Sequence, residues 1–278
     1  MKALIHKIIP NTFIDGPGSR MAIFFQGCNM RCLYCHNPET QQCCDHCGVC
    51  VRICPAGALS LAEQRVIYNS GLCRQCDLCI RACPRCSSPK CQELEEAELY
   101  RRVAAAADFL DGVTVSGGEA SLQGEFLERF FRLVKAGTGL TTFLDTNGTI
   151  APPLLQRLVE VTDGFMVDLK AYHPVLHQEL TGVPNRAVLE NIRYLAERGL
   201  LYEVRTVVVP GYTDRPAEIE NIARLVKEQS DRALLKLIRF RPIGVRTFLA
   251  GTAPLTDEHF AELLRLARAL LGERVVAV

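Results

Sequence analysis

The sequence predicts an α/β fold of six strand–helix units, interrupted near its start by a small cysteine-rich insert. Short apolar runs alternate with longer segments of helical spacing, which is the pattern of parallel strands joined by right-handed helical crossovers. The cysteines all fall within one early segment, and glycine-rich or polar motifs directly follow the predicted strands. Because strands of a parallel sheet end at the same edge, the fold would gather these motifs in one place.

The predicted strands are short apolar runs that end in glycine or charged residues. The first, MAIFF, is apolar throughout and precedes the first cysteine motif. β-Branched and aromatic residues dominate the later runs, as expected of buried parallel strands. In chain order the predicted strands are Met21–Phe25, Gly112–Ser116, Thr141–Leu144, Phe165–Leu169, Glu203–Val209 and Leu234–Phe240.

The predicted helices follow from apolar residues at 3.6-residue spacing and from residues that begin or end helices. Alanines favour the first helix, Pro153 stands near the start of the third, and Gly199 ends the fourth. Six strand–helix units allow either a doubly wound sheet or an incomplete barrel. The predicted helices are Glu93–Leu110, Glu125–Lys135, Pro153–Val161, Asn185–Arg198, Ala217–Gln229 and Glu258–Leu271.

Length and composition are those of a globular protein. The 278 residues suffice for one large barrel-like domain or two ordinary ones, with 48% hydrophobic and 23% charged residues. A formal net charge of +1 indicates neither a nucleic-acid nor a membrane-surface partner. The longest apolar runs are too short to span a bilayer. The start, MKALIHKIIPNTFIDGPG, lacks a sustained apolar region, so we expect no signal peptide.

The chain has 14 cysteines, all between residues 28 and 91. A secreted disulfide scaffold would distribute them along the whole chain. Their confinement to one segment instead indicates a metal or redox cofactor in a reducing, cytoplasmic setting.

The stretch QGCNMRCLYCHNPET, residues 26 to 40, places Cys28, Cys32 and Cys35 at C-x3-C-x2-C spacing. Three thiolates on one loop suit a soft metal centre. Structural zinc sites use four ligands, and a [4Fe-4S] cluster has four irons to ligate. The motif therefore leaves one coordination position open, unless a distant residue fills it.

Residues 44–55 (CDHCGVCVRICP) and 73–84 (CRQCDLCIRACP) repeat the pattern C-x2-C-x2-C-x3-C-P. This is the bacterial ferredoxin run, whose fourth cysteine ligates the other cluster in two-cluster ferredoxins. A pair of zinc knuckles is the less favoured alternative, because zinc spacing usually has two C-x2-C pairs. The crossing assigns one [4Fe-4S] cluster to Cys44, Cys47, Cys50 and Cys83, and the other to Cys54, Cys73, Cys76 and Cys79.

Residues 41–92 are accordingly predicted to be a ferredoxin-like insert between 1–40 and 93–278. The cysteines left over are Cys43, Cys86 and Cys91. Cys86 and Cys91 could replace Cys83 as a ligand or remain free thiols. So short and polar a segment has little apolar core, and we expect its clusters to hold it together.

The motifs that follow the later strands are GGE, DTNG, DLK, VPG and RFR. Each has a plain structural explanation as well: Gly117 and Gly118 as an ordinary turn, Asp145 as a helix cap, Lys170 in a surface ion pair. Arg205 is less ordinary, since a charge on a buried strand of valines needs a partner. The functional interpretation depends on the joint occurrence of the motifs.

These motifs together resemble the radical S-adenosylmethionine (SAM) superfamily, and within it the glycyl radical enzyme activating enzymes, relatives of pyruvate formate-lyase activating enzyme. The resemblance covers residues 12 to about 250. It implies a partial (β/α)6 TIM-like barrel with an insert like that of the larger members. Its motifs are FIDGPGSRMAIFFQGCNMRCLYCHNPET, DGVTVSGGEASLQGEF, FLDTNG, TDGFMVDLK and RTVVVPGYTD.

The resemblance implies a chemistry for the open iron position. In the family, the amino and carboxylate groups of SAM chelate the fourth iron of the cluster, here on Cys28, Cys32 and Cys35. One electron splits the sulfonium into methionine and a 5′-deoxyadenosyl radical. That radical removes a hydrogen atom from a backbone glycine of a separate glycyl radical enzyme. With the two insert clusters, the chain would carry three [4Fe-4S] clusters.

The resemblance also implies roles for further residues. Gly117 and Gly118 would let the backbone approach the methionine amino group. Asp145, Thr146, Met166 and Asp168 match positions that give oxygens to a monovalent cation. Asp15 and Arg20, in and beside the DGPG segment, match the region that meets the partner. Lys170 and Arg205 would be catalytic residues, and Asn37 would be a further neighbour of the adenine. The residues expected to contact SAM are Tyr34, Cys35, His36, Gly117, Gly118, Asp145, Asp168, Leu169, Lys170 and Arg241.

One departure concerns the end of the sixth strand, where relatives have a histidine and this chain has Arg239-Phe240-Arg241. This difference weakens any inference from the relatives about which partner enzyme this chain activates. The resemblance implies a monomer that docks transiently on its partner, with a flavodoxin or a ferredoxin as electron donor. The alternatives are a radical SAM enzyme or maturase acting on another substrate, a plain ferredoxin-type electron carrier, and a zinc-stabilised interaction module.

Overall fold

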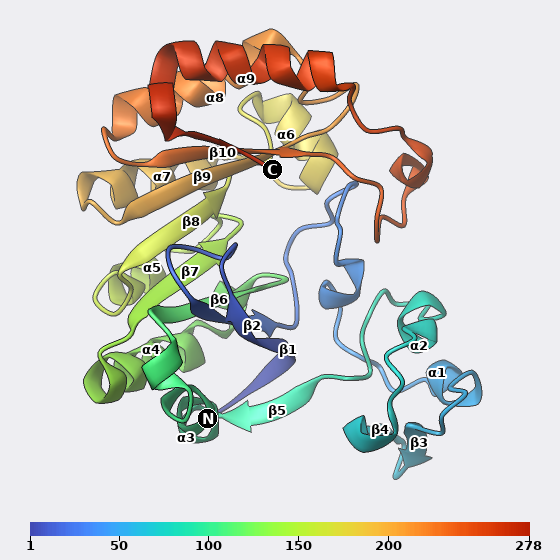
Figure 1. Cartoon of the computed structure of the whole chain (residues 1–278). Helices are drawn as coiled ribbons and strands as arrows, with labels where there is room; N and C mark the ends of the chain where they lie inside the picture. Colours follow the sequence, from blue (N-terminus) through green and yellow to red (C-terminus); the bar gives the residue numbers. More distant parts are fainter.

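In the computed structural model, which describes residues 1–278, nine strands form one open sheet (Figure 1). Its order is β11-β10-β9-β8-β7-β6-β2-β1-β5, so the two edge strands do not close on each other. The six predicted strands are confirmed and neighbouring pairs among them are parallel. They are β2 (Arg20–Phe25), β6 (Gly112–Gly117), β7 (Thr141–Thr146), β8 (Gly164–Asp168), β9 (Leu201–Val208) and β10 (Leu234–Arg239).

Three strands that flank the six predicted ones were not predicted: β1 (Lys2–Thr12), β5 (Gln92–Glu95) and β11 (Val275–Ala277). β1 lies antiparallel between β2 and β5, and β11 runs parallel to β10. The pairing of β5 with the start of β1 also explains an error in the prediction. The helix expected from Glu93 begins only at Glu96, because the residues before it are held extended by the sheet.

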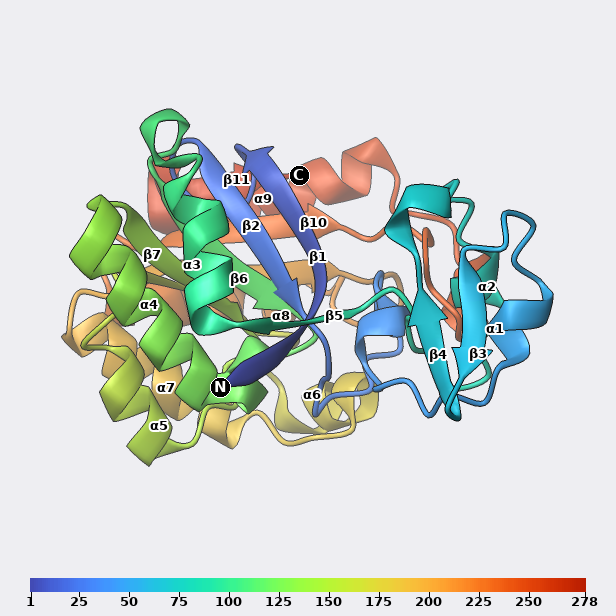
Figure 2. The same cartoon turned by 90° about the horizontal axis from the view of Figure 1, so that it is seen from below.

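Helices cover the outer face of the curved sheet, and the inner face is left without a helical layer (Figures 1 and 2). This arrangement is an incomplete barrel rather than a doubly wound sheet. The core lies between the sheet and these helices, where Val113 and Val115 of β6 share one apolar cluster with Phe126 and Phe130. The covering helices are α3 (Glu96–Ala104), α4 (Gly124–Thr138), α5 (Pro152–Leu158), α7 (Arg186–Glu197), α8 (Pro216–Gln229) and α9 (Asp257–Leu271).

The inner face of the sheet is polar because side chains alternate along each strand. On β6, Thr114 and Ser116 alternate with the core valines, and on β9, Arg205 alternates with Val204. A further short helix, α6 (Pro174–Thr181), was not predicted and follows the end of β8. None of the helices combines the length and the apolar character that crossing a bilayer requires.

Residues 41–92 project to one side of the sheet (Figure 1). A bridge between Gln42 and Ser87 joins the two ends of this segment. Its interior is small and contains Cys50 and Cys79 beside Leu59 and Val66. The elements of the segment are α1 (Val49–Arg52), the antiparallel hairpin of β3 (Leu59–Ala62) and β4 (Arg65–Tyr68), and α2 (Leu78–Arg81).

Candidate functional site

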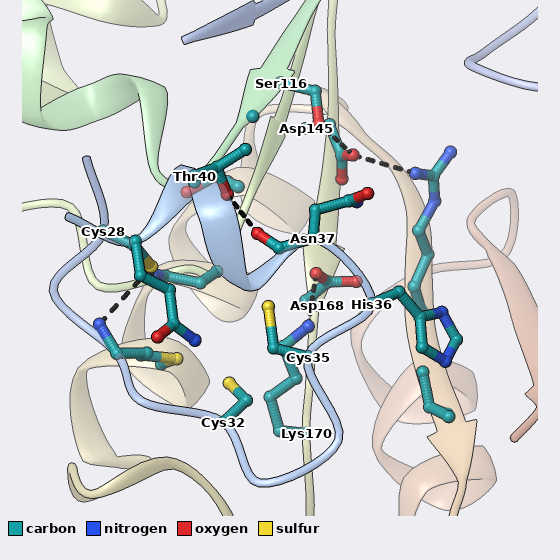
Figure 3. Close-up of a pocket in the computed structure, with 18 of the residues that line it drawn as sticks. Cys28, Cys32, Cys35, His36, Asn37, Thr40, Ser116, Asp145, Asp168 and Lys170 are labelled. Carbon is teal, nitrogen blue, oxygen red and sulfur yellow. Dashed lines mark hydrogen bonds and ion pairs between the residues drawn. The ribbon is translucent and has the colours of Figure 1, made fainter. Parts of the chain in front are cut away.

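The carboxyl ends of the parallel strands surround a cavity of about 390 Å³. Its size suits a small-molecule cofactor. Figure 3 shows Asp168 and Lys170 near Cys35, with Asp145 and Ser116 at the end of the view away from Cys32. The residues predicted from the motifs that line it are Cys28, Cys32, Tyr34, Cys35, His36, Asn37, Gly117, Gly118, Asp145, Thr146, Asp168, Lys170 and Arg205.

The loop that carries the three cysteines is held by backbone hydrogen bonds at both ends. The amides of Gly27 and Cys28 donate to the carbonyls of Thr40 (2.8 Å) and Gln41 (3.0 Å). In its middle, the amides of Arg31 and Leu33 donate to the last carbonyls of α6, at 2.9 Å each. Helix α6, which the sequence did not predict, therefore supports the cysteine loop.

Burial raises the pKa of all three thiols of this loop, that of Cys32 to about 12. The positive charge of Lys170 opposes the shift in each case. Without a metal the thiols are therefore neutral at pH 7. A metal centre that binds them must displace their protons, so assembly releases protons and weakens as the pH falls.

Gly117 and Gly118 line the cavity, but the structure gives a different reason for them than the one expected. A Cβ at Gly117 would lie 2.2 Å from the carbonyl oxygen of Phe25, and one at Gly118 would lie 2.2 Å from that of Gly27. The amide of Gly118 donates to the carbonyl of Phe25 at 3.0 Å. The glycines are thus needed for the close approach of two backbones, which seats the cysteine loop on β6.

Glu119, the last residue of the GGE motif, is fully buried and received no specific role from the sequence. Its carboxylate accepts hydrogen bonds from the Thr146 hydroxyl (2.9 Å) and the Asn147 amide (2.7 Å). The Asn147 side chain in turn donates to Asn29 Oδ1 (2.8 Å) and lies 3.9 Å from Cys28 Sγ. This chain of contacts fixes the DTNG turn against the cysteine loop.

Four charged side chains from the strand ends line the cavity in two ion pairs. Asp168 accepts from Lys170 Nζ at 2.6 Å, and Asp145 Oδ2 lies 3.1 Å from Arg205 Nη1. The Asp145 oxygen also accepts from the Ser116 hydroxyl at 2.8 Å. Burial raises the pKa of Asp145 and Arg205 opposes that shift, while nearby Asp168 holds the pKa of Lys170 well above its usual range despite its burial.

Three buried polar atoms around the cavity have no hydrogen-bond partner: Tyr34 Oη, His36 Nε2 and Asp145 Oδ1. Buried polar atoms in folded proteins nearly always have a partner. Their position in the cavity wall therefore indicates where a polar ligand bonds.

Three residues predicted to contact SAM or the cation do not line this cavity. Leu169 is fully buried, and its carbonyl accepts from the Thr206 hydroxyl at 2.8 Å. Met166 is also buried, with its sulfur beside Arg205. Arg241 is exposed and lines a separate hollow with Pro242 and Val278.

Asp15 and Arg20 were both expected to contact a partner, but only Asp15 lies in the cavity lining. Asp15 lines the cavity from the loop that joins β1 to β2. Arg20 is fully buried, and the expectation that it contacts a partner directly is wrong for this structure. Its guanidinium donates to the Thr114 hydroxyl (2.7 Å) and the Pro17 carbonyl (3.1 Å), so it supports the loop from beneath.

The eight assigned cysteines of residues 41–92 border two separate hollows. Cys44, Cys47, Cys50 and Cys83 line one, and this set is the first of the two predicted by the crossed pattern. The other hollow is lined by the second set, with Tyr68 and Lys90 beside it. That set is Cys54, Cys73, Cys76 and Cys79.

With this geometry established, comparison with known proteins identifies the class. A model of the Radical SAM superfamily matches residues 22–226, and the chain belongs to this superfamily. The pyruvate formate-lyase 1-activating enzyme of Escherichia coli is 32% identical over 252 residues, which are 88% of this chain and 84% of that protein. The isethionate sulfite-lyase activating enzyme of Desulfovibrio desulfuricans is 28% identical and covers 94% of this chain and 92% of its own length.

Solved structures share the fold at lower identity. QueE from Escherichia coli superposes with a TM-score of 0.56 at 14% identity, covering 100% of this chain and 94% of that one. A domain of pyruvate-formate lyase-activating enzyme from Bacteroides vulgatus covers 60% of this chain and 98% of its own, with a TM-score of 0.51 at 21% identity. At these identities the likeness extends to the fold alone.

Proposed function

We propose that this chain is the activating enzyme of a glycyl radical enzyme, acting in the cytoplasm. One observation carries the proposal: Cys28, Cys32 and Cys35 line the same cavity as Asp15 of the DGPG loop. The three cysteines would bind a cluster that has one open iron. Asp15 belongs to the DGPG segment that activating enzymes share, and it lies in the same cavity. The sequence relatives named above, which activate pyruvate formate-lyase and isethionate sulfite-lyase, support the same function.

The residues present fit a [4Fe-4S] cluster and SAM. Three cysteine thiols supply the soft ligands that iron–sulfur clusters use. The unpartnered atoms of Tyr34, His36 and Asp145 supply polar contacts for a ligand with an adenine, a ribose and an amino acid end. When bound, cluster and SAM supply a 5′-deoxyadenosyl radical, released with methionine on one-electron cleavage of the sulfonium, and that radical accepts the glycine hydrogen atom.

The protein's own residues provide binding, orientation and charge. Cys28, Cys32 and Cys35 would hold three irons of the cluster. Lys170, fixed by Asp168, supplies positive charge beside the three thiolates and the ligand carboxylate. Asp15, half-buried in the cavity lining, would contact the glycine loop of the partner. Buried Tyr34 helps to exclude water from the cysteine loop.

A monovalent cation beside the ligand carboxylate belongs to the same proposal. Asp145, Thr146 and Asp168 line the cavity, and Asp145 Oδ1 has no partner in the protein. Met166 is adjacent to Asp145 across the β7–β8 pairing, so its carbonyl would complete the set. Oxygen ligands of this kind suit a hard cation.

Residues 41–92 are proposed to carry two further [4Fe-4S] clusters. The two sets of four cysteines around separate hollows support this, because the crossed sharing of Cys54 and Cys83 is the ferredoxin arrangement. We propose that the chain acts as a monomer, with 1–40 and 93–278 as the catalytic body, and that a flavodoxin or a ferredoxin supplies the electrons.

The test is anaerobic reconstitution, with about twelve irons per chain expected for three clusters. The loaded protein is reduced with dithionite, and 5′-deoxyadenosine is measured after addition of SAM. Glycyl radical formation is then followed by electron paramagnetic resonance (EPR) with pyruvate formate-lyase, choline trimethylamine-lyase, isethionate sulfite-lyase and indoleacetate decarboxylase as partners. A fully loaded protein that releases no 5′-deoxyadenosine would reject the proposal.

Two cysteine variants separate the sites. Cys32→Ala should abolish SAM cleavage, because it removes a ligand of the cluster with the open iron. Cys47→Ala should lower the iron content by one cluster and slow electron delivery, while SAM binding persists. A normal rate of cleavage by Cys32→Ala would show that the open iron lies elsewhere.

A further inference from the structure

A buried carboxylate, Glu203, lies beneath the cavity and belongs to none of the motifs used above. It is 2% exposed. Its Oε1 accepts a hydrogen bond from Arg205 Nε, and its Oε2 lies 2.9 Å from Lys236 Nζ. Glu203 therefore binds two cations at once, one of which lines the cavity.

A bulge in β9 brings these residues to the inner face of the sheet. Phe165 pairs with Leu201, but the next residue, Met166, pairs with Glu203, so Tyr202 is an extra residue on β9. If Tyr202 paired with Met166 in regular register instead, Val204 and not Arg205 would stand opposite Asp168. A shift of one residue moves every later side chain to the other face, and bulges often re-aim side chains next to active sites.

Arg205 is shared between two carboxylates. Its Nε bonds Glu203 below, and its Nη1 reaches Asp145 Oδ2 above at 3.1 Å. A guanidinium is planar and its donors have fixed directions, so two carboxylate partners determine its orientation. Lys236, on the neighbouring strand directly beside Arg205, engages the second oxygen of Glu203. The two cations and two carboxylates balance one another in a place where unpaired charge is costly.

We propose that Glu203, assisted by Lys236, is a positioning residue that orients Arg205 toward Asp145 and the cavity. This rests on the proposed function, because the ligand of that cavity is taken to be SAM. With Asp145 Oδ2 engaged by Arg205 and Ser116, the Oδ1 atom stays unpartnered and available. Removing Glu203 frees Arg205 to turn fully onto Asp145 and occupy that atom, which closes a ligand contact.

The test compares Glu203→Gln with the charge-balanced double variant Glu203→Gln/Lys236→Met. After anaerobic reconstitution, we would measure the iron content, the midpoint of urea unfolding and the affinity for SAM. The affinity is obtained from the change that SAM causes in the EPR spectrum of the reduced cluster. We expect both variants to bind SAM about tenfold or more weakly, as for loss of a charged hydrogen bond. The double variant should regain the wild-type midpoint but not the SAM affinity.

Asp163→Asn is the control, because it weakens the hydrogen bond from the buried Thr142 amide (2.8 Å) and the ion pair with exposed Lys135, at the opposite end of the sheet. It should lower the midpoint and leave SAM affinity unchanged. The positioning role of Glu203 would be overturned if the double variant bound SAM with wild-type affinity. It would also be overturned if Asp163→Asn weakened SAM binding as much as the Glu203 variants do. If the loaded wild type neither binds nor cleaves SAM, the proposed function itself fails, and this outcome is visible before any variant is compared.

Discussion

A side chain on Gly118 would meet the carbonyl oxygen of Gly27, since a Cβ built there lies 2.2 Å from that oxygen. The contact joins the end of β6 to the start of the cysteine loop. The next amide, that of Glu119, donates to the same oxygen at 2.7 Å. The loop that holds the cysteines is therefore seated by backbone atoms, and its position depends on the absence of a side chain.

Gly118→Ala should accordingly displace the cysteine loop. We expect the free energy of unfolding to fall by about 3 kcal/mol, as for overpacking against rigid neighbours, with less iron bound at the first cluster. Urea unfolding and iron analysis under anaerobic conditions measure both effects. Gly251→Ala is the control, since no atom lies within 4 Å of its added Cβ. Equal stability of the two variants would contradict this account.

Arg20→Met tests the support of the DGPG loop. The Arg20 guanidinium donates to the carbonyls of Pro17, Val113 and Thr141, and the substitution removes these hydrogen bonds from a fully buried position. We expect a loss of about 3 kcal/mol in unfolding free energy. Activation of a partner, seen as the glycyl radical signal, should fall more than cleavage of SAM in its absence.

The exposed Arg129 provides a control for the loss of one arginine, because its ion pair to Glu96 is long, at 3.8 Å. Arg129→Met should change stability by less than about 0.5 kcal/mol. If Arg20→Met lowers both activities by the same factor, Arg20 does not act through the loop.

His6 predicts a pH dependence of stability. Burial is the largest cause that lowers its pKa to about 4, and its Nε2 lies 3.9 Å from Glu39 Oε1, too far for a hydrogen bond. Between about pH 6.5 and pH 4, the unfolded chain binds a proton that the folded chain does not. Stability is therefore lost as the pH falls through this window, by up to about 3 kcal/mol from this group.

His6→Gln should remove that share of the pH dependence, because glutamine does not titrate. Anaerobic urea unfolding at pH 7.5 and pH 5.0 measures it, with cluster absorbance followed separately. An unchanged difference between the two pH values in the variant would show that other groups cause it.

Arg246 connects the catalytic body to the insert. Its guanidinium donates to the Ile80 carbonyl of α2 at 2.7 Å, while the adjacent Thr247 hydroxyl donates to the Leu33 carbonyl of the cysteine loop at 2.5 Å. Arg246→Ala should loosen α2 and speed hydrogen exchange of the amides of residues 78–83 by about tenfold. Arg85→Ala is the control, because its partner Asp45 lies within the insert. Equal exchange in both variants would mean that Arg246 does not hold the insert.

Much of the fold could be predicted because buried parallel strands are short apolar runs. The six central strands were found in this way, but the edge strands were not. β1 alternates too irregularly to stand out, and β5 is a polar tetrapeptide, QELE, that is extended only because β1 pairs with it. Helix α6 was missed for a similar reason, since its eight residues carry little periodicity.

The candidate site likewise contains features that the local sequence predicts and features that depend on tertiary packing. Cysteine spacing predicted which cysteines lie together in the first loop and around the two hollows of residues 41–92, because such spacing is read from neighbouring residues. The role of Glu203 has no local signal, because it depends on a bulge in β9 and on Lys236 of the neighbouring strand. The burial of Arg20 and the exposure of Arg241 likewise follow from how distant segments pack.

The sequence by itself determined the alternation of strands and helices, the three-cysteine loop and the repeated cysteine run, because each is written in neighbouring residues. Only the tertiary structure decided which polar residues share a cavity, which carboxylates Arg205 bonds, and why Gly118 bears no side chain. Those outcomes depend on strand register and on the close approach of backbones, and both are properties of contacts between segments far apart in the chain.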